Sequence, residues 1–153
     1  APYAGLVFQA SDSILVDPGL LLGIIREESS FDHLATSSAG AKGLIQLMPG
    51  TASDVARWND LPRLSGDDFY DPWNSLRYGS LYIDRQFRNY GGELPLLLAA
   101  YNAGPGNASR WRDTFGYSAS DPEMFIEQIT FRETRNYVKK VTRSAWVYRR
   151  LFQ

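Results

Sequence analysis

Residues 20–31 read LLLGIIREESSF, and this stretch decides how the rest of the chain is interpreted. Its apolar residues return at helical spacing, about 100° per residue, and therefore gather on one face of a helix. Glu28 falls in the middle of that face, whereas Arg26 points the other way and Glu27 lies at its edge. The pattern predicts that one of two adjacent glutamates is surrounded by apolar side chains. Those apolar residues are Leu20, Leu21, Ile24, Ile25 and Phe31.

A carboxyl group in such surroundings has its charged form disfavoured, so we expect the pKa of Glu28 to be raised. A raised pKa is what a general acid needs when it works near neutral pH. Structural ion pairs also place acids on apolar helix faces, so a core Glu satisfied by a buried Arg or by backbone donors explains the pattern as well. Periodicity alone leaves both interpretations of Glu28 open.

The composition is that of an ordinary globular domain. A chain of 153 residues is long enough for one domain with its own core and needs no disulfide or metal to hold it. The net charge of −1 does not suggest a nucleic-acid partner, and the absence of Cys excludes thiol catalysis. The apolar runs are too short to cross a membrane. Because the first residue is Ala1, we expect a processed chain or an excised domain from which the targeting segment is missing.

Helical signals recur along the whole chain. Asp-Pro pairs, which supply an N-cap followed by Pro at the first helical position, occur at 17–18, 71–72 and 121–122. No segment alternates with a period of two for long, so the prediction is one all-α domain over residues 1–153. Helices are expected over 18–31, 48–58, 73–90, 94–103, 107–112 and 134–152, with loops over 59–70 and 113–120.

The segment after Glu28 is small, polar and supplied with glycine. Residues 35–43 read ATSSAGAKG, in which glycine allows close approach of the backbone, and they lead towards Gln46. A lone acid beside such a loop and a Gln is consistent with a cleft for a neutral, hydroxyl-rich ligand. A plain turn that connects two helices accounts for the same residues.

Four short motifs follow one another along the chain. The first two are IREESSF at 25–31 and the segment from Ala35 to Ala52, which contains GLIQLMP. The third is AYNAGPG at 100–106, and the fourth is ETRNYV at 133–138. In order and spacing these motifs resemble those of the soluble lytic transglycosylase (SLT) family, and the resemblance covers about Val16 to Leu151.

The resemblance implies a goose-type lysozyme-like helical domain with a substrate cleft, and an enzyme that cleaves peptidoglycan. The bond would be the β-1,4 link between N-acetylmuramic acid and N-acetylglucosamine. Glu28 matches the single catalytic acid/base of the family, which differs from ordinary glycosidases with their two carboxylates. It would protonate the leaving oxygen, assisted by the N-acetyl group of the substrate, and then deprotonate the C6 hydroxyl that closes a 1,6-anhydro ring.

The same resemblance implies roles for further motif residues. Tyr101 matches an aromatic residue beside the catalytic acid, where its hydroxyl can orient a carboxyl or an N-acetyl carbonyl. Asn102 either contacts the N-acetyl group or holds the turn in which it lies. The implied substrate-binding residues are Ser37, Gln46, Met48, Tyr101, Asn102, Glu133 and Tyr137.

Two other functions stay open. A hydrolytic muramidase of lysozyme type would need a second carboxylate or an ordered water opposite Glu28, and the candidates are Asp32, Asp54 and Glu133. A non-catalytic glycan-binding module is the third possibility. We expect no metal and no cofactor, since His33 is the only His and Cys is absent. The expected partners are glycan strands of peptidoglycan and no nucleic acid, for a monomeric, extracytoplasmic domain in the periplasm or at the cell wall.

Overall fold

The computed structural model describes all residues, 1–153. They form eight α-helices and one 3₁₀ helix, and the only β-type pairs are two isolated bridges within residues 36–47. The predicted all-α class is confirmed. The elements are α1 (Ala4–Ser11), α2 (Pro18–Ser29), α3 (Pro49–Asn59), η1 (Gly66–Tyr70), α4 (Pro72–Asn89), α5 (Leu94–Ala103), α6 (Pro105–Phe115), α7 (Pro122–Glu127) and α8 (Arg132–Leu151).

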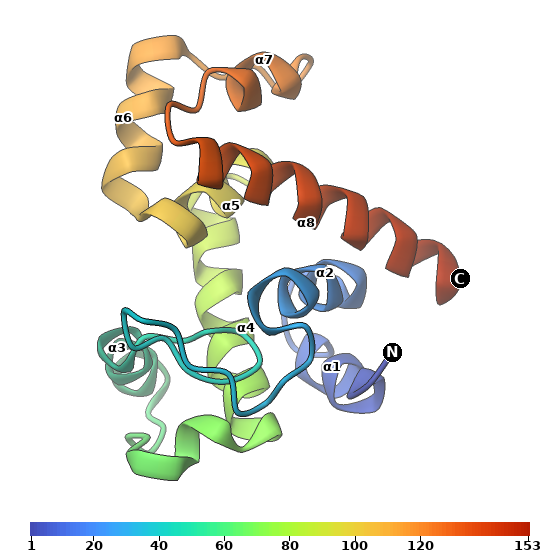
Figure 1. Cartoon of the computed structure of the whole chain (residues 1–153), viewed down its shortest axis with the longest axis vertical. Coiled ribbons are helices and arrows are strands. Elements are labelled where there is room, and N and C mark those ends of the chain that lie inside the picture. The colour runs from blue at the N-terminus through green and yellow to red at the C-terminus, as the bar shows by residue number, and fades with distance from the viewer.

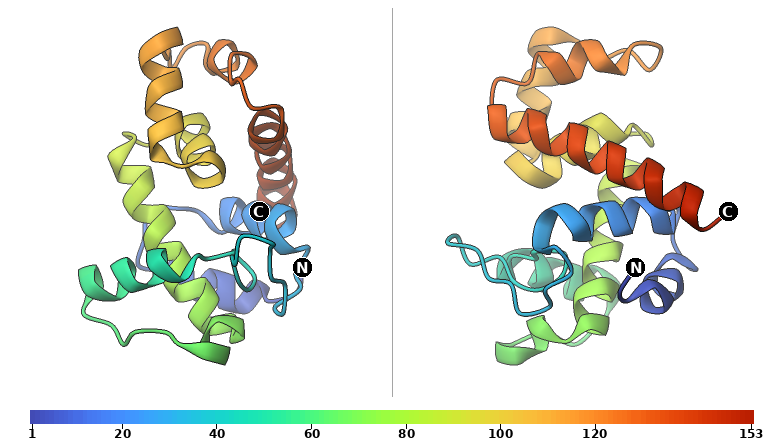
Figure 2. Two further views of the ribbon diagram at one scale, coloured as in Figure 1. Left: turned by 60° about the vertical axis from the view of Figure 1, so that its left-hand side comes forward. Right: turned by 45° about the vertical axis from the view of Figure 1, so that its right-hand side comes forward.

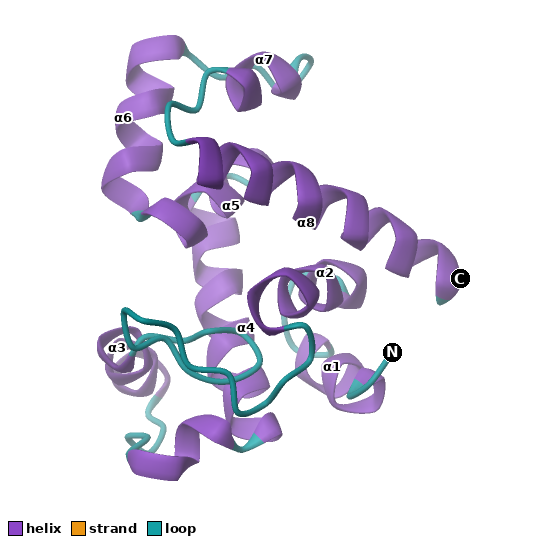
Figure 3. Ribbon diagram, in the orientation of Figure 1, coloured by secondary structure: helices purple, strands orange, loops and turns teal.

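Three helices form the frame of the molecule. α4 runs through its middle, and α2 and α8 lie side by side in opposite directions, as the right-hand view of Figure 2 shows. In Figure 1, α6 and α7 lie at the top of the molecule, and α3 lies at the left beside the lower half of α4. Figure 3 shows that the segment between α2 and α3 is a long irregular loop, residues 30–48. No helix combines the length and the apolar character needed to cross a bilayer.

The Asp-Pro pairs begin helices as predicted. Asp17, Asp71 and Asp121 each accept a hydrogen bond at one side-chain oxygen from the backbone N–H three residues later, at 3.1, 2.9 and 3.4 Å. Each Pro occupies the first helical position, where its missing N–H leaves no bond unmade. These caps fix where α2, α4 and α7 start.

The structure also contains short elements that the sequence patterns do not predict. α1 buries only Val7 and Ala10, so its 8 residues show little apolar periodicity. η1 lies inside the expected loop 59–70, where a capping box between Ser65 and Asp68 holds a single tight turn. α7, by contrast, begins at Pro122 as the Asp-Pro pair predicts, and it has only 6 residues.

α6 is longer than the expected helix over 107–112. Gly104 adopts φ 90°, a conformation that favours glycine, and this turn ends α5 and reverses the chain. Pro105 then begins α6 immediately, and the helix continues to Phe115. The Gly-Pro-Gly segment at 104–106 thus ends one helix and begins the next.

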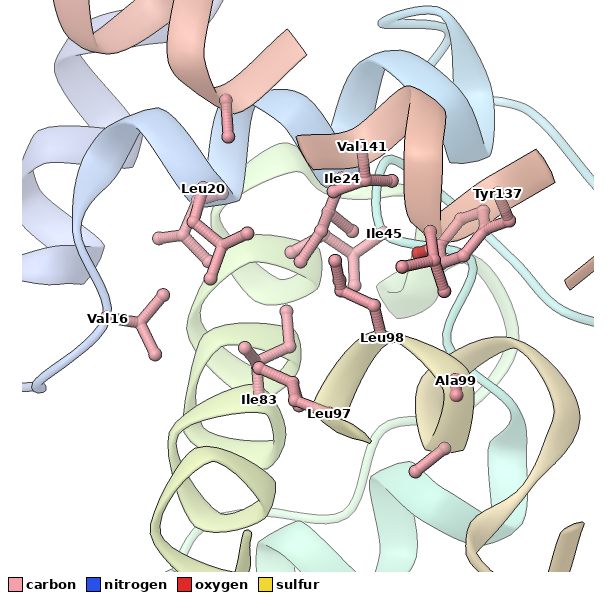
Figure 4. Close-up of a cluster of buried hydrophobic side chains, with 14 of the residues drawn as sticks. Val16, Leu20, Ile24, Ile45, Ile83, Leu97, Leu98, Ala99, Tyr137 and Val141 are labelled. Carbon is pink, nitrogen blue, oxygen red and sulfur yellow. The ribbon is translucent and has the colours of Figure 1, made fainter. Parts of the chain in front are cut away.

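The main core lies where α2, α4, α5 and α8 meet, and it contains 26 buried residues. Figure 4 shows Ile24 of α2, Ile45 of the long loop and Val141 of α8 close together in this core, with Tyr137 at its edge. A second cluster of 7 buried residues packs α3 and η1 against α4. The apolar face predicted around Glu28 is therefore the surface that α2 buries.

Glycines allow α2 and α8 to approach each other closely. A Cβ atom placed on Gly23 would lie 2.9 Å from the backbone nitrogen of Ala145 and 3.1 Å from the carbonyl oxygen of Val141. At the far end of the pair, Arg149 donates two hydrogen bonds to the Asp17 carboxylate, at 2.8 and 3.0 Å. The start of α2 is thus tied to the end of α8, and backbone-to-backbone contact sets the spacing between them.

Adding a methyl group at Gly23 should push these two helices apart. We expect Gly23→Ala to lower the free energy of unfolding by roughly 1–3 kcal/mol, because backbone atoms of α8 cannot move aside as a flexible side chain would. Gly5→Ala is the matched control, since no atom lies within 4 Å of a Cβ there. Urea denaturation of both variants measures the difference, and an equal effect of the two substitutions would contradict this account of the contact.

Candidate active site

A cleft of about 520 Å³ opens at the C-terminal end of α2. Its walls come from the long loop 30–48, the start of α3, the middle of α4, the end of α5 and the first turn of α8. The fold therefore brings residues from all four sequence motifs to one place, with the exception of Tyr137, which lies behind the wall. The predicted residues that line the cleft are Glu28, Ser37, Gln46, Met48, Tyr101, Asn102 and Glu133.

Glu28 lies where the apolar face of α2 reaches the cleft. Ile24 and Ile25, one turn earlier, are fully buried, whereas Arg26 is exposed, as the periodicity predicts. Glu27 is half-buried and accepts a hydrogen bond from the Ser144 hydroxyl at 3.2 Å, so it belongs to the contact between α2 and α8. Of the two adjacent glutamates, only Glu28 faces the cleft.

Burial raises the pKa of Glu28 to about 7. The cause is desolvation, which disfavours the charged carboxylate. The negative charges of Glu133 and Glu27 raise the pKa further, and the hydroxyl of Tyr137 opposes this by favouring the carboxylate. At neutral pH the carboxyl group is therefore about half protonated, and it can both give and take a proton.

Tyr137 supports Glu28 from inside the protein. Its side chain is only 8% exposed, and its hydroxyl is buried without any protein atom at hydrogen-bond distance and geometry. The hydroxyl nevertheless acts on the Glu28 carboxyl closely enough to lower its pKa. Tyr137 therefore does not line the cleft, and its hydroxyl stabilises the ionised form of Glu28.

Tyr101 has a different partner from the one expected. Its hydroxyl donates a hydrogen bond to the carbonyl oxygen of Ile45 at 2.7 Å, which ties α5 to the long loop. The Tyr101 hydroxyl thus donates its proton to the backbone and not to a carboxyl or an N-acetyl group. The Tyr101 ring borders the cleft beside Tyr82 of α4, with 6.0 Å between the ring centroids.

The long loop is held in shape by its own polar side chains. Gln46 adopts φ 56°, and its amide nitrogen donates to the carbonyl oxygens of Ala35 at 3.1 Å and Gly43 at 3.0 Å. The Ser37 hydroxyl accepts a hydrogen bond from the backbone N–H of Ala41 at 3.0 Å. The amide oxygen of Gln46 and the hydroxyl proton of Ser37 therefore remain as one acceptor and one donor for a ligand.

Asn102 links α5 to α8. Its side-chain oxygen accepts a hydrogen bond from the Thr134 hydroxyl at 2.7 Å, which agrees with the structural role considered for it. The amide nitrogen of Asn102 remains as a donor on the cleft side. Thr134 is buried, and the next residue towards the helix start, Glu133, reaches the cleft.

Only one candidate for a second carboxylate reaches the cleft. Asp54 forms an ion pair with Arg57 at 3.0 Å, and Asp32 accepts a hydrogen bond from the backbone N–H of Leu34 at 3.0 Å. Neither of them lines the cleft, whereas Glu133 does. No group of three or more His, Asp or Glu side chains is arranged to hold a metal ion.

Several residues that line the cleft are not among the predicted site residues. Tyr82 lies on α4 beside residues that are buried in the core, and an aromatic residue in that position is a signal that could have pointed to it. The others have small side chains or lie at turns of the backbone, and none is a residue type that by itself indicates a binding site. They include Ser38, Ala39, Ala41, Thr51, Ala100, Gly104 and Pro105.

Comparison with known proteins agrees with this geometry. The sequence matches the family described as "Transglycosylase SLT domain" over residues 5–123. It is 37% identical over 123 residues to the soluble lytic murein transglycosylase of Escherichia coli (strain K12), which covers 78% of this chain and 19% of that protein. It is 31% identical over 172 residues to the membrane-bound lytic murein transglycosylase C of Mannheimia succiniciproducens, covering 97% and 47%. The chain thus spans less than half the length of these relatives.

Solved structures share the fold. The lytic transglycosylase Slt of Pseudomonas aeruginosa, an inactive Glu-to-Gln variant, gives a TM-score of 0.92 at 33% identity and covers 99% of this chain and 25% of that one. The 70 kDa soluble lytic transglycosylase of Escherichia coli gives 0.90 at 31% identity, covering 98% and 24%. A complex of the 70 kDa enzyme with bulgecin A gives 0.91 at 30%, covering 99% and 24%. The predicted lysozyme-like helical fold is confirmed.

Replacing a neighbour of Glu28 should shift the pKa of Glu28 in the direction opposite to the effect of the group that is removed. Glu133→Gln removes a negative charge, so we expect the pKa of Glu28 to fall below about 7, whereas Tyr137→Phe removes a favourable hydroxyl, so we expect it to rise. Carbon-13 NMR titration of the Glu28 carboxyl measures both shifts. Glu123→Gln, at an exposed site away from the cleft, is the control. Shifts of equal sign in the Glu133 and Tyr137 variants would contradict this arrangement.

Proposed function

Because the chain belongs to the transglycosylase SLT domain family, we propose that it cleaves the glycan strands of peptidoglycan as a lytic transglycosylase. The observation that carries this proposal is Glu28, a carboxyl group with a pKa of about 7 at the end of a cleft. The cleft contains no Lys, Arg or His, which suits a substrate that is neutral and rich in hydroxyl groups.

The proposed reaction breaks the β-1,4 bond between N-acetylmuramic acid and N-acetylglucosamine. The proton of Glu28 moves to the glycosidic oxygen as the bond from that oxygen to C1 of the muramic acid breaks. The N-acetyl group of the same sugar stabilises the positive charge that develops at C1. The Glu28 carboxylate then takes the proton of the C6 hydroxyl, whose oxygen bonds to C1. Glu28 ends protonated as it began, and the product carries a 1,6-anhydro ring.

One residue can perform both steps because its two protonation states are nearly balanced. Desolvation keeps the acid form available for the first step, and the Tyr137 hydroxyl stabilises the carboxylate for the second. Around the reacting sugar, Ser37, Gln46 and Asn102 offer polar groups for its hydroxyl and N-acetyl substituents. We propose them as substrate-binding residues, with Met48 and Tyr101 as apolar and aromatic walls of the cleft.

The known activities of similar proteins support the proposal. They are named as murein transglycosylases, soluble in Escherichia coli and membrane-bound in Mannheimia succiniciproducens. The solved Pseudomonas aeruginosa enzyme is inactive when one Glu is replaced by Gln, which is consistent with a single essential carboxyl. We propose that this domain likewise works on the extracytoplasmic cell wall, and that it is monomeric when isolated.

A hydrolytic muramidase is the second candidate, and one observation favours it. Glu133 lines the same cleft as Glu28, and its negative charge acts on the Glu28 carboxyl. A second carboxylate in that place could activate a water molecule as inverting glycosidases do. The two candidates differ in the atom that attacks C1, which is the C6 hydroxyl oxygen in one case and the oxygen of water in the other.

Digestion of peptidoglycan in ¹⁸O-labelled water separates these candidates. If the C6 hydroxyl closes the ring, mass spectrometry should find unlabelled 1,6-anhydromuramic acid ends and few new reducing ends. Glu28→Gln should lower turnover about 10²–10⁴-fold or more, because an amide cannot exchange a proton. Glu123→Gln, which changes an exposed carboxyl outside the cleft, should retain turnover.

The label gives the opposite result if water is the nucleophile. Predominant incorporation of ¹⁸O at C1 of the muramic acid would replace the transglycosylase by the muramidase. Binding of glycan strands without any product would leave only the glycan-binding module.

A further inference from the structure

A second pocket, of about 240 Å³, lies where α1 and the end of α3 pack against the N-terminal part of α4. Figure 1 shows α1 and α3 on either side of the lower part of α4. We call it the α4 pocket, and it shares no residue with the cleft at Glu28. The polar and aromatic side chains that line it are Gln9, Ser13, Asn59, Trp73, Arg77 and Ser80.

The cleft and the α4 pocket use opposite faces of α4. Tyr82 lines the cleft, whereas Trp73 and Ser80 of the α4 pocket come before it in the same helix. At about 100° per residue, both lie within about 20° of the side directly opposite Tyr82, and Arg77 lies within about 40° of that side. A ligand in the α4 pocket and a sugar at Glu28 therefore do not compete for space.

Several polar groups of the α4 pocket have no partner within the protein. The Arg77 side chain is exposed and takes part in none of the ion pairs of the structure. The indole N–H of Trp73 is accessible and unbonded, whereas that of Trp111 donates to the Thr130 hydroxyl at 2.8 Å. Asn59 donates its amide hydrogen to a backbone carbonyl of α3, so its side-chain oxygen remains as an acceptor.

The charge of the α4 pocket is opposite to that of the cleft. Arg77 is its only charged residue, and no Asp or Glu lines it. Asp84, one turn after Ser80, already accepts hydrogen bonds from the backbone N–H of Leu15 at 2.8 Å and from Arg88 at 2.9 Å. An anionic group in the α4 pocket would therefore meet an unpaired guanidinium.

The α4 pocket also has an apolar wall. The ring of Trp73 is half-buried and packs against the main core, and Leu61 and Leu81 line the pocket with it. A sugar ring has a face of C–H groups and an edge of hydroxyl groups, which suits a Trp ring surrounded by polar side chains. The volume is below the roughly 300–1,000 Å³ of pockets for drug-sized ligands, and it suits a ligand of about one sugar ring.

We propose that the α4 pocket binds an N-acetylated sugar acid, with the carboxylate on Arg77 and the sugar ring against Trp73. A guanidinium binds a carboxylate through charge-assisted hydrogen bonds, and the Trp73 N–H and the Asn59 oxygen match the polar substituents of the sugar. In peptidoglycan this chemistry belongs to N-acetylmuramic acid whose lactyl carboxylate carries no peptide, so the natural ligand rests on the proposed function. Because the pocket and the cleft lie on opposite faces of α4, the bound sugar would belong to a part of the wall other than the strand held at Glu28.

The four tryptophans give this proposal a direct readout, because none of them lines the cleft. The probes are N-acetylmuramic acid and its methyl amide, in which the lactyl carboxylate is blocked as it is by a peptide. In nitrogen-15 NMR titrations we expect the acid to shift the Trp73 indole signal saturably, with little effect on those of Trp58, Trp111 and Trp146. The amide should bind roughly fivefold more weakly. Trp73→Phe, which lacks the indole N–H, identifies the signal.

Replacing the cation tests the assigned contact. Arg77→Gln should weaken binding of the acid roughly fivefold, to the level of the amide, and leave binding of the amide unchanged. Arg110→Gln removes the same charge at an exposed site outside the α4 pocket, so it should preserve the preference for the acid. Added salt should weaken binding of the acid more than that of the amide.

Three results would overturn the inference: no shift of the Trp73 signal, equal binding of acid and amide, or an Arg77→Gln variant that keeps the preference for the acid. Equal movement of all four indole signals would indicate unspecific binding and would overturn it as well. The proposed function fails by a different sign, the absence of anhydro products, which this titration of uncleaved monosaccharides does not measure.

Discussion

The close packing of α2 against α8 is the constraint on which the rest of the structure depends. The absence of a side chain at Gly23 lets the backbone of α2 reach the backbone of α8, and Asp17 with Arg149 fixes the far end of the pair. The opposite side of α2 carries Ile24 and Ile25, which are fully buried in the main core, and Glu28 stands at the end of that apolar face. The main core and the cleft are both built on this helix pair.

The raised pKa of Glu28 is linked to the stability of the fold. A carboxyl with a pKa of about 7 in the folded state and 4.5 in the unfolded state binds more protons when folded, so its contribution to stability is largest below pH 4.5. As the pH rises from 4.5 to 7, the free energy of unfolding falls by ~3 kcal/mol on account of this group, and above pH 7 the loss is complete. The protein thus carries a group at its cleft that is unfavourable for folding at neutral pH and favourable for proton transfer.

The sequence predicts the parts of this arrangement that depend on short-range pattern. Helical periodicity separates Glu28 from Arg26, and Asp17 before Pro18 marks the start of α2, because caps and faces are set by neighbours along the chain. The partners of Tyr101 and Tyr137 depend on contacts between distant segments: one hydroxyl turns to the Ile45 carbonyl, and the other lies behind Glu28. The place of Tyr82 in the cleft could not be predicted for the same reason, since it depends on the packing of α5 beside α4. Short elements such as α1 and η1 are missed because few of their residues are buried.

We conclude that burial, and not a structural ion pair, keeps a proton on Glu28 at neutral pH. The most direct test of this conclusion is the free energy of unfolding of the unmodified chain and of Glu28→Gln, each measured by urea denaturation from pH 4 to pH 8. The difference between the two cancels the titration of other groups and isolates Glu28. We predict that the unmodified chain loses ~3 kcal/mol relative to the variant between pH 4.5 and 7, in the direction of lower stability at higher pH. Parallel stability curves, or a relative gain of the unmodified chain as the pH rises, would contradict the account.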